Sequence, residues 1–340
     1  MLIHFAATLL AQQVAEQTMS ANPLVTVLAF LLMLGILVIV HELGHFVTGL
    51  WMGVKVEEFG IGYPPRALTL FERNGIKYTL NWLPLGGFVR FGGEENTLYG
   101  VGSLAAAAPW RKILVMVAGP LMNLLLTIAI FVVFAATIGL QTPTGTQRVA
   151  LVYANTPAAK AGLLVGDEIV SFHGLSVAQA GRVGEIASAA DGVTIPMVIR
   201  RDGAELTIQV TPGPWTTPDG EQRSAGVGIS YSPERRTLIA TNPVEAVVFG
   251  TQQTFDLLGQ MLRGLPNIPA SIGSIFRPNT SPAEDPIGPV GIARVTGEVV
   301  QRGGLTAFFS LMAVLSLNLF LLNLLPIPTL EGSHIIFSLV

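Results

Sequence analysis

The stretch LVTVLAFLLMLGILVIVHELGH, residues 24–45, joins an apolar run of membrane-spanning length to two histidines and a glutamate. In a helix, positions i and i+4 lie on one face, so His41 and His45 can share one zinc ion. The carboxylate of Glu42 can then reach the metal-bound water as a general base. Polar side chains inside a hydrophobic span are costly unless they are paired or bound to a metal. The pattern therefore predicts hydrolytic chemistry at membrane depth; the alternative is a helix end whose polar residues meet water.

The composition is that of a membrane protein. Half of the 340 residues are hydrophobic and 12% are charged, which is too apolar for a chain that is water-soluble throughout. Residues 24–40, 113–140 and 305–325 each come near the roughly 20 residues that a bilayer core requires. A fourth apolar run begins at His334 and stops at residue 340. We expect an α-helical membrane protein with three complete spans and a truncated fourth, or a terminus that lies at the interface.

Lysine and arginine counts predict the orientation of the spans. Residues 1–23 carry neither residue type and lack the charged start of a secretory signal, so they are interpreted as an N-terminal tail. The connection 52–112 carries seven basic residues and is predicted to be cytosolic. The long region 141–304 then lies outside. The net charge of −3 gives no nucleic-acid footprint, and the absence of cysteine excludes a thiolate zinc site and a catalytic thiol.

The outer region begins with the alternating pattern of a small α+β domain, residues 146–212, with a helical pattern at 177–190. The string NTPAAKAGLLVGDEI, residues 155–169, resembles a PDZ domain. Such domains bind an extended peptide or a free C-terminus by strand addition. The alternative is a folded spacer that only blocks bulky substrates. The pattern in residues 242–265 predicts an interfacial amphipathic helix, and that in residues 266–289 a loop.

The cytosolic connection contains the string LPLGGFVRFGG, residues 83–93, in which apolar residues stand between glycine pairs. This pattern predicts a short, membrane-associated β-hairpin whose unpaired backbone groups could bind an extended substrate segment. A purely structural hairpin is the alternative. The candidate substrate-binding residues here are Gly86, Gly87, Phe88, Val89 and Arg90.

A catalytic zinc ion usually has three protein ligands and one water, so the two histidines leave the site one group short. After the third span, the string NLLPIPTLEGSH, residues 323–334, contains two prolines that break the helix at membrane depth. Irregular backbone is tolerated there only when it is buried in protein or lines a wet cavity. An unpaired carboxylate would be strongly unfavourable, which makes Glu331 the candidate third ligand. His334 is the alternative, as a ligand, as a hydrogen-bond partner of a ligand, or as a polar residue at a helix start.

Four features together resemble the site-2 protease family of intramembrane zinc metalloproteases, and specifically its bacterial regulator-of-sigma-E protease branch. They are the HELGH motif, the string AGPLMN at residues 118–123, the PDZ-like insert and the segment 323–332. The resemblance covers nearly the whole chain in the same order. The family's motif has aspartate followed by two glycines where this chain has Glu331, Gly332 and Ser333.

Carried over residue by residue, the resemblance implies one zinc ion per chain, with Glu42 as the general base and Asn323 near the substrate or the oxyanion. Asn123, at the end of the AGPLMN string, is a further candidate substrate-binding residue. The zinc ligands that the resemblance implies are His41, His45 and Glu331.

The resemblance further implies a multi-pass protease of the bacterial inner membrane, with the PDZ-like domain on the extracytoplasmic side. Its substrates would be single-span membrane proteins already shortened on the outer side, such as anti-sigma factors or remnant signal peptides. Because a transmembrane helix hides its peptide bonds, the substrate must unwind locally. The alternative function is an inactive membrane protein that binds others through its PDZ-like domain. A metal transporter would need more polar groups along its spans than Asn123 and a few hydroxyls.

Overall fold

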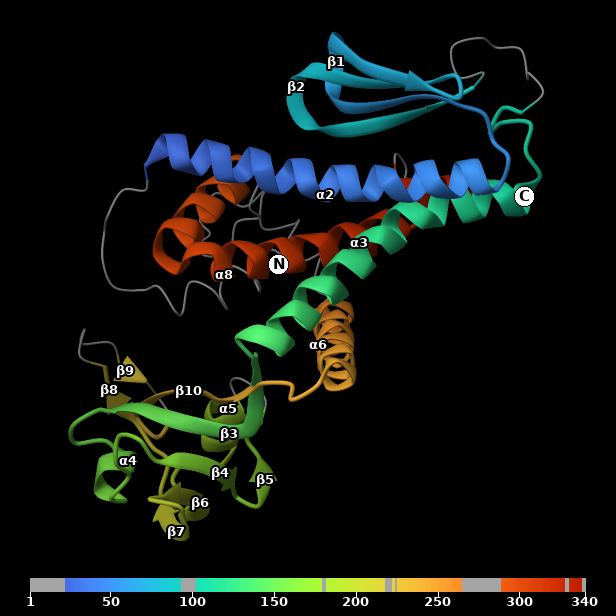
Figure 1. Ribbon diagram of the computed structural model, residues 1–340. Coiled ribbons are helices and arrows are strands. Elements are labelled where there is room, and N and C mark those ends of the chain that lie inside the picture. The colour runs from blue at the N-terminus through green and yellow to red at the C-terminus, as the bar shows by residue number, and fades with distance from the viewer. Residues whose placement is uncertain are drawn as a thin grey trace. The chain divides into compact units, whose positions relative to one another are not determined.

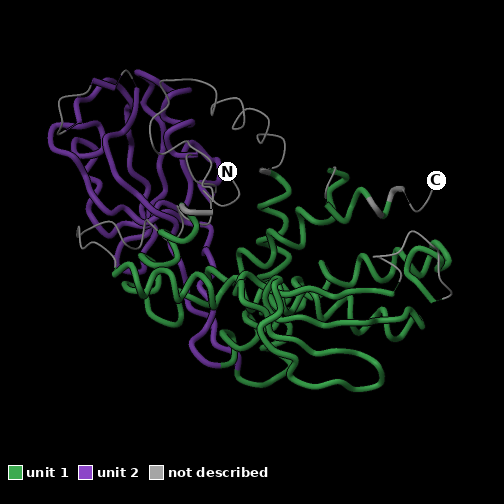
Figure 2. Tube along the Cα trace, turned by 90° about the horizontal axis from the view of Figure 1, so that it is seen from above, with its two compact units in different colours: residues 1–136, 241–340 green, residues 137–240 purple. Residues whose placement is uncertain are grey.

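The computed structural model describes residues 22–92, 102–178, 182–217, 222–223, 225–264, 289–327 and 330–337. The chain divides into two compact units, residues 1–136 with 241–340, and residues 137–240 (Figure 2). The predicted N-terminal tail and the predicted loop at 266–289 lie, apart from their last residues, outside the described residues, as does the end of the predicted hairpin at Gly93.

Three helices of the first unit are long and apolar enough to cross a membrane: α2 (Pro23–Trp51), α3 (Pro109–Thr137) and α8 (Pro289–Leu324). The three predicted spans are therefore present. α8 is interrupted at Gly304, whose backbone dihedrals (φ 61°, ψ −151°) are not helical. Only glycine adopts this conformation readily, which explains why the interruption occurs at this residue. The apolar part of α8 starts immediately after it, where the third span was predicted.

The second span lies a few residues earlier in the chain than the predicted 113–140. It begins at Pro109, because proline has no N–H to lose at the first helical position and its φ is already helical. Gly139, with φ 82°, follows its end, and a strand starts at Leu140. Apolar residues continue across this boundary, so hydropathy alone placed the helix end too late.

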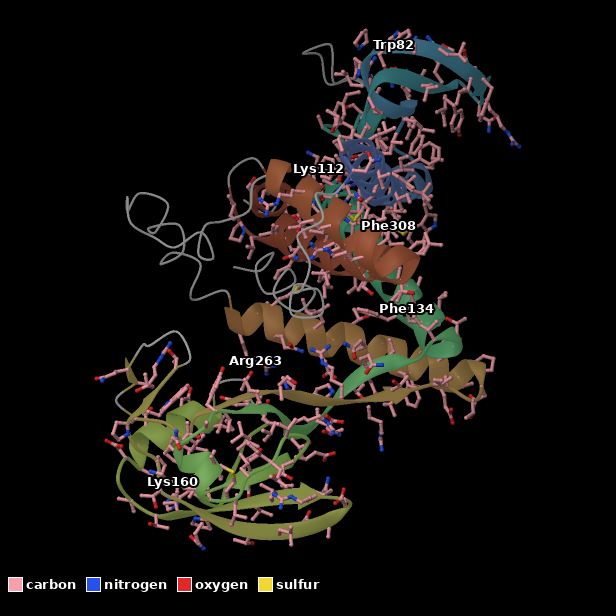
Figure 3. The ribbon with its side chains drawn as sticks, turned by 90° about the vertical axis from the view of Figure 1, so that its left-hand side faces the viewer. Trp82, Lys112, Phe134, Lys160, Arg263 and Phe308 are labelled. Carbon is pink, nitrogen blue, oxygen red and sulfur yellow. The ribbon has the colours of Figure 1, made fainter. Side chains whose placement is uncertain are left out.

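Close approach of the three helices depends on small and hydroxyl side chains. A Cβ on Gly44 of α2 would lie 2.3 Å from the carbonyl oxygen of Ala118 in α3. The hydroxyl of Thr127 donates a hydrogen bond to the carbonyl of Ala313 in α8 (3.1 Å). Phe308 of α8 is buried (Figure 3). Figure 1 shows α2 and α8 side by side, so the first unit contains a helical core that can hold polar groups away from lipid.

A short helix, α9 (Glu331–Phe337), follows the proline-containing segment after α8. It starts at Glu331, the candidate ligand, three residues before His334, where the fourth apolar run was predicted to begin. The described part of α9 is shorter than a membrane span, so the fourth span stays a prediction. The side chain of His334 is outside the described residues, and so are residues 328 and 329.

The connection 52–112 forms a larger sheet than the predicted hairpin at 83–93. Its strands are β1 (Val56–Arg73) and β2 (Ile76–Phe91), and the sheet lies against α2 (Figure 1). The prediction was wrong about its extent because Pro64 and Pro65 indicate a break in the sequence pattern, whereas the strand bends there and continues.

The register shows how the two bent strands form four segments. Gly60 pairs with both Thr79 and Phe88, so the first half of β1 lies between the two halves of β2. Residues 87–91 therefore form an edge of this sheet among the described residues. Trp82, in the bend of β2, is 71% exposed (Figure 3). The edge at residues 87–91 thus lies on the side of the sheet that faces α2, and the bend that contains Trp82 is exposed.

The helix α6 (Pro243–Gly264) lies where an amphipathic helix was predicted at 242–265. One face contacts α3, where a Cβ on Gly250 would be 2.5 Å from the backbone nitrogen of Val132. Its exposed apolar residues include Val244, Val247, Val248, Phe255 and Leu262. This second apolar face is compatible with the predicted interfacial position.

The second unit is built around a six-stranded antiparallel sheet with the order β10-β3-β4-β6-β7, with β5 paired to β4. Its elements are β3 (Leu140–Val152), α4 (Pro157–Lys160), β4 (Glu168–Phe172), β5 (Leu175–Ser176), α5 (Arg182–Ala189), β6 (Ile195–Arg201), β7 (Ala204–Val210), β8 (Trp215–Thr216), β9 (Gln222–Arg223) and β10 (Ile229–Leu238). The core includes Ile169, Phe172, Met197 and Ile199, all fully buried. These strands and helices form one hydrophobic core.

The predicted boundaries of this domain, 146–212, were too narrow. β10 pairs with β3 along most of its length, so residues up to 238 belong to the sheet rather than to the predicted helix-and-loop region 213–304. β10 has the polar sequence ISYSPERRTL, and its partner is far away in the chain, so local alternation gave no signal. The helix predicted at 177–190 is shorter, Arg182–Ala189.

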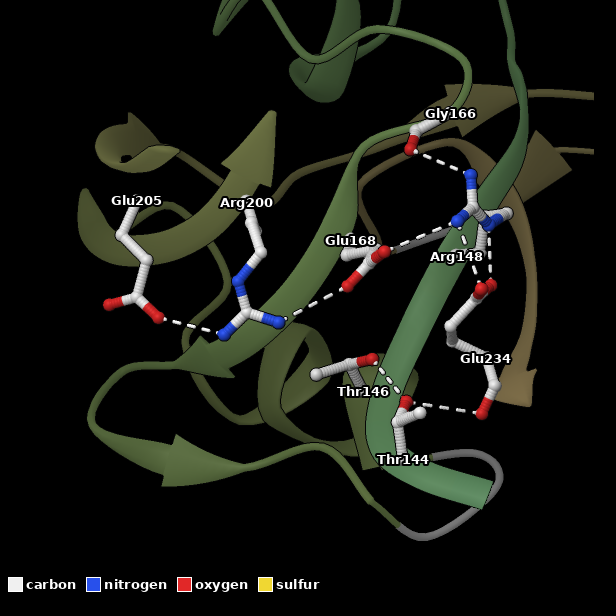
Figure 4. A network of polar contacts seen from close by, with 8 residues as sticks. All are labelled: Thr144, Thr146, Arg148, Gly166, Glu168, Arg200, Glu205 and Glu234. Atoms are coloured by element: carbon white, nitrogen blue, oxygen red, sulfur yellow. Dashed lines mark hydrogen bonds and ion pairs between the residues drawn. The ribbon is translucent and has the colours of Figure 1, made fainter. Parts of the chain in front are cut away.

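A row of alternating charges crosses the sheet of the second unit, with one residue on each of five strands (Figure 4). Arg148 binds Glu234 on one side and Glu168 on the other, the latter at 3.2 Å. Arg200 continues the row, 3.3 Å from Glu168 and 2.9 Å from Glu205. Hydrogen bonds from Arg148 hold the pKa of Glu234 below its usual value. We name these five residues the charge ladder.

Candidate metal centre

Two residues of α2 and one of α9 bring their ligand atoms together. Nε2 of His41 lies 2.6 Å from Oε1 of Glu331. Nε2 of His45 lies 3.1 Å from that of His41 and 3.2 Å from the same carboxylate oxygen. Within the part of the chain that is described, these three form the group that could hold a metal ion. The helical spacing of the histidines and the long-range approach of Glu331 thus produce one cluster.

The cluster fits a zinc ion. Two ligand atoms about 2.0–2.1 Å from a tetrahedral zinc ion lie about 3.3 Å apart, which is close to two of the three separations here. Two imidazoles and a carboxylate are also a common donor set of catalytic zinc, and they leave a fourth position for water. Oε2 of Glu331 is buried and has no hydrogen-bond partner among the described residues. A metal ion would compensate a carboxylate that is otherwise incompletely paired.

The second ring nitrogen of each histidine also has a neighbour in α3. Nδ1 of His45 lies 2.7 Å from the carbonyl oxygen of Val115. Because a carbonyl only accepts, this nitrogen carries the ring proton, and the lone pair of Nε2 faces the cluster. Nδ1 of His41 lies 3.2 Å from Nδ2 of Asn123. Partners of this kind fix the tautomer and the ring orientation of zinc-binding histidines.

Glu42 lies beside the cluster and contacts the edge of the β1–β2 sheet. Its Oε2 accepts a hydrogen bond from the backbone N–H of Val89 (3.1 Å). Gly87 is also close, since a Cβ there would be 3.9 Å from Cγ of Glu42. The other carboxylate oxygen of Glu42 is not held by this hydrogen bond. The predicted substrate-binding segment and the predicted general base are therefore neighbours.

The remaining candidate residues lie at different places. Gly86 approaches Val38 of α2, where a Cβ would be 2.6 Å from a side-chain carbon. Arg90 pairs with the buried carboxylate of Glu58 at 3.3 Å, and its guanidinium lies over the ring of Phe88. Asn323 is partly buried in the last turn of α8, eight residues before the candidate ligand. Asn123 is fully buried, and its side chain faces His41.

The Glu58 carboxylate also stabilises the sheet that carries the edge segment. Burial raises its pKa, but hydrogen bonds from Thr79 and Arg66 and the charges of Arg66 and Arg90 outweigh burial and hold the pKa below its usual value. The hydroxyl of Thr79 donates to Oε1 at 2.7 Å, and Nη2 of Arg66 donates to Oε2 at 2.8 Å. This network ties Arg90 to the middle of the sheet.

Two glycines to which the sequence analysis assigned no role permit the close approach of the ligands. A Cβ on Gly119 of α3 would lie 2.3 Å from Nε2 of His45 and 2.8 Å from Nε2 of His41. A Cβ on Gly332 would lie 2.3 Å from the carbonyl oxygen of Leu325. The sequence did carry a signal, because Gly119 lies in the AGPLMN string and Gly332 immediately follows the candidate ligand.

Buried polar groups on α3 and α8 were also missed. Ser316 donates a hydrogen bond to the carbonyl of Asn123 at 2.7 Å, and Thr127 donates to the same carbonyl at 3.1 Å. Asn318 is buried, and its Nδ2 donates to the carbonyl of Val314. The sequence did contain a signal for these groups. Polar residues within an apolar span are costly unless they are hydrogen bonded, so their presence there indicates buried hydrogen bonds.

Comparison with known proteins shows similarity along nearly the whole chain. The model of a family described as peptidase family M50 matches residues 29–340. A predicted zinc metalloprotease of Mesorhizobium japonicum is 34% identical over 335 residues, which covers 92% of this chain and 88% of that protein. One from Agrobacterium fabrum is 31% identical and covers 92% of this chain and 85% of that protein. One from Clostridium perfringens is 33% identical, with coverage of 91% and 86%.

Proposed function

Because this chain belongs to peptidase family M50 and is a zinc metalloprotease with membrane-spanning helices, we propose that it hydrolyses peptide bonds within the transmembrane segments of single-span membrane proteins. The observation that carries this proposal is the cluster of His41, His45 and Glu331 on helices of a membrane-spanning unit, with Glu42 beside it. A hydrolytic centre at this depth is best placed to act on a substrate that is itself in the bilayer.

The chemistry assigns the proton transfers to Glu42. Bound zinc supplies a Lewis acid that polarises the scissile carbonyl and lowers the pKa of water. Glu42 accepts the proton of the attacking water and then returns it to the leaving amine. The N–H of Val89 holds one oxygen of this carboxylate, so the other is directed to the water. We assign Asn323 to the substrate or oxyanion side of the site.

The edge segment of the β1–β2 sheet would bind the substrate. A transmembrane helix satisfies its backbone groups internally, so it must unwind before a peptide bond can be attacked. Strand addition at residues 87–91 would compensate the lost hydrogen bonds. Since Val89 in this segment donates to Glu42, a strand paired here would bring its peptide bonds next to the base. Helix-breaking residues in the substrate should therefore promote cleavage.

The second unit would act on the part of the substrate outside the membrane. We assign residues 137–240 as a PDZ-like domain on the extracytoplasmic side of a bacterial inner membrane. One support is the seven basic residues of the connection 52–112, because short cytosolic loops carry an excess of lysine and arginine. The other is β10, which lies at one end of the sheet order among the described residues. A free C-terminus exposed by earlier shortening of the substrate could pair with such an edge. Anti-sigma factors and remnant signal peptides are the substrate classes this predicts.

The test is cleavage of a single-span substrate by the full chain in proteoliposomes. In Glu42→Gln, we expect the rate to fall by about 10²–10⁴-fold, because a general base contributes that factor. Bound zinc should not change. Glu57→Gln is the matched control, because Glu57 is partly exposed and pairs with Lys55. Cleavage at the wild-type rate in Glu42→Gln would contradict the proposed mechanism.

A further inference from the structure

Asn123 combines complete burial with an unbalanced set of hydrogen bonds. Its side chain is 0% exposed, and Nδ2 lies 3.2 Å from Nδ1 of His41. Its Oδ1 is buried and has no hydrogen-bond partner among the described residues. A buried amide oxygen without a hydrogen-bond partner is unfavourable, because it has lost its bonds to water. We therefore expect the protein to have a state in which this oxygen accepts a hydrogen bond.

Zinc binding by His41 determines which atom must face its ring. When Nε2 gives its lone pair to a metal, the ring proton is on Nδ1, which then needs an acceptor. An amide nitrogen cannot accept, whereas an amide oxygen can. The two ends of the asparagine side chain have the same shape, so a half-turn of the amide exchanges them within the same space. The exchange also gives the unpaired Oδ1 a partner.

We propose that Asn123 is a positioning residue for the zinc ligand His41: its Oδ1 accepts the Nδ1 proton and so directs the Nε2 lone pair to the metal. This inference rests on the proposed role of His41 as a ligand. Asn123 therefore acts through the histidine, and it has no exposed surface with which to touch a substrate.

The two histidines are thus held in different ways. For His45, the acceptor is the main-chain carbonyl of Val115, which no substitution removes. For His41, the acceptor is a side chain, and its backbone is fixed by the Ser316 hydroxyl from α8. α8 consequently contributes to the metal site through Asn123 as well as by leading to Glu331. This connection runs from Ser316 through Asn123 to His41.

The test measures zinc affinity of the purified full chain by competition with a chelator. Asn123→Leu has a similar shape and no acceptor, so we expect zinc affinity to fall about 10–100-fold, the usual effect of losing such a partner. Asn123→Asp keeps an acceptor and cannot donate when ionised, so it should bind zinc within a few-fold of wild type. Thr254→Val is the matched control, because it removes a fully buried hydroxyl of α6 whose hydrogen bond goes to the carbonyl of Gly250 in the same helix.

Cobalt substitution adds a spectroscopic readout that a general loss of packing would not move. The visible bands of Co²⁺ should shift in Asn123→Leu and stay near wild type in Asn123→Asp and Thr254→Val. Equal losses of zinc affinity in the Leu and Asp variants would overturn the proposal, because the acceptor would then be irrelevant. Unchanged zinc affinity in Asn123→Leu, with cleavage lost, would overturn it in favour of a role toward the substrate.

Separate variants test the role of His41 as a zinc ligand and the role of Asn123 in positioning it. A His41→Ala variant that bound zinc as tightly as wild type would contradict the role of His41 itself. If Asn123→Leu does not fold, the Asp variant alone still decides, since a loss of 10-fold or more there contradicts an acceptor role.

Discussion

The zinc cluster and the charge ladder are both made of ionisable side chains, but their surroundings differ. In the ladder, each arginine lies between two carboxylates, and the side chains of Arg148 and Arg200 are 45% and 38% exposed. In the cluster, the side chains of His41 and His45 are 11% and 12% exposed, and an oxygen of Glu331 is unpaired among the described residues.

The difference separates structural from functional charge. In the charge ladder, each charge is paired with an opposite charge and is partly hydrated, so it needs no further partner. Such ion pairs contribute modestly to stability. A buried set of three ligand atoms is incomplete without an ion, because burial without compensation is costly. Substitutions should therefore have large, specific effects in the cluster and small, salt-dependent effects in the ladder.

The largest effect is expected at Glu331. Glu331→Ala should lower zinc affinity by more than about 100-fold, since even the loss of a hydrogen-bond partner of a ligand costs 10–100-fold. Glu331→Asp retains the carboxylate but shortens its reach by one methylene, so it should retain zinc with reduced affinity. Metal content and cleavage measured on both variants check this. Full zinc content and full cleavage in Glu331→Ala would remove this residue from the site.

Gly119 should be the next most sensitive position. A Cβ there would meet the ligand nitrogens of both histidines, and overpacking of this kind costs about 1–3 kcal/mol. We therefore expect Gly119→Ala to lower zinc affinity about 10-fold or more. Gly35→Ala is the control, since a Cβ on that glycine of α2 meets nothing within 4 Å. Equal zinc affinity in the two variants would show that the ligands are not where they are described.

The buried ion pair of the second unit should give an intermediate effect on stability. Asp167 is 2% exposed and binds Arg201 through two oxygens at 2.7 Å, and it accepts from Leu164 N at 2.8 Å. Burial raises the pKa of Asp167, but these bonds outweigh burial and hold the pKa below its usual value. Asp167→Asn should lower the free energy of unfolding of this unit by about 2 kcal/mol at neutral pH.

The pH dependence follows from the lowered pKa. The stability that Asp167 contributes is complete above the pKa of an unfolded aspartate, about 3.9, and is lost as the pH falls through the lower native value. Hydrogen exchange of β6 in the full chain measures it. The wild-type and Asp167→Asn chains should differ at pH 7, and the difference should shrink as the pH falls through the lowered native pKa of Asp167. A difference that grew toward low pH would contradict the sign of this shift.

The smallest effect is expected in the charge ladder. Glu168 lies between two partly exposed arginines, and exposed ion pairs contribute about 0–1 kcal/mol. Glu168→Gln should change the free energy of unfolding by less than about 1 kcal/mol, and salt should reduce the difference. Thermal melting at low and high salt checks it. A loss as large as that of Asp167→Asn would mean that the ladder is more than a solvated surface feature.

Features that depend on local pattern were predictable from the sequence. The i and i+4 spacing of His41 and His45 defines their common helix face whatever the rest of the chain does. The proline pair after the third span indicated an irregular segment, and a carboxylate in such a place implied a partner. Helical spans could be read from hydropathy, because their length is set by the bilayer.

Features that depend on distant pairing were not predictable. β10 belongs to the sheet only because it meets β3, and neither its polar sequence nor its proline indicated this. The bend at Pro64 and Pro65 hid the full extent of the β1–β2 sheet. The contact of Ser316 with Asn123 joins two helices whose packing angle and rotation no local pattern contains.

The central claim is that one zinc ion joins α2 to α9. X-ray absorption at the zinc edge of the purified full chain tests it most directly. We expect two imidazole nitrogens and a carboxylate oxygen at about 2.0–2.2 Å from the zinc ion, with one imidazole lost in His45→Ala and the carboxylate lost in Glu331→Ala. A zinc spectrum that neither substitution changed would contradict it.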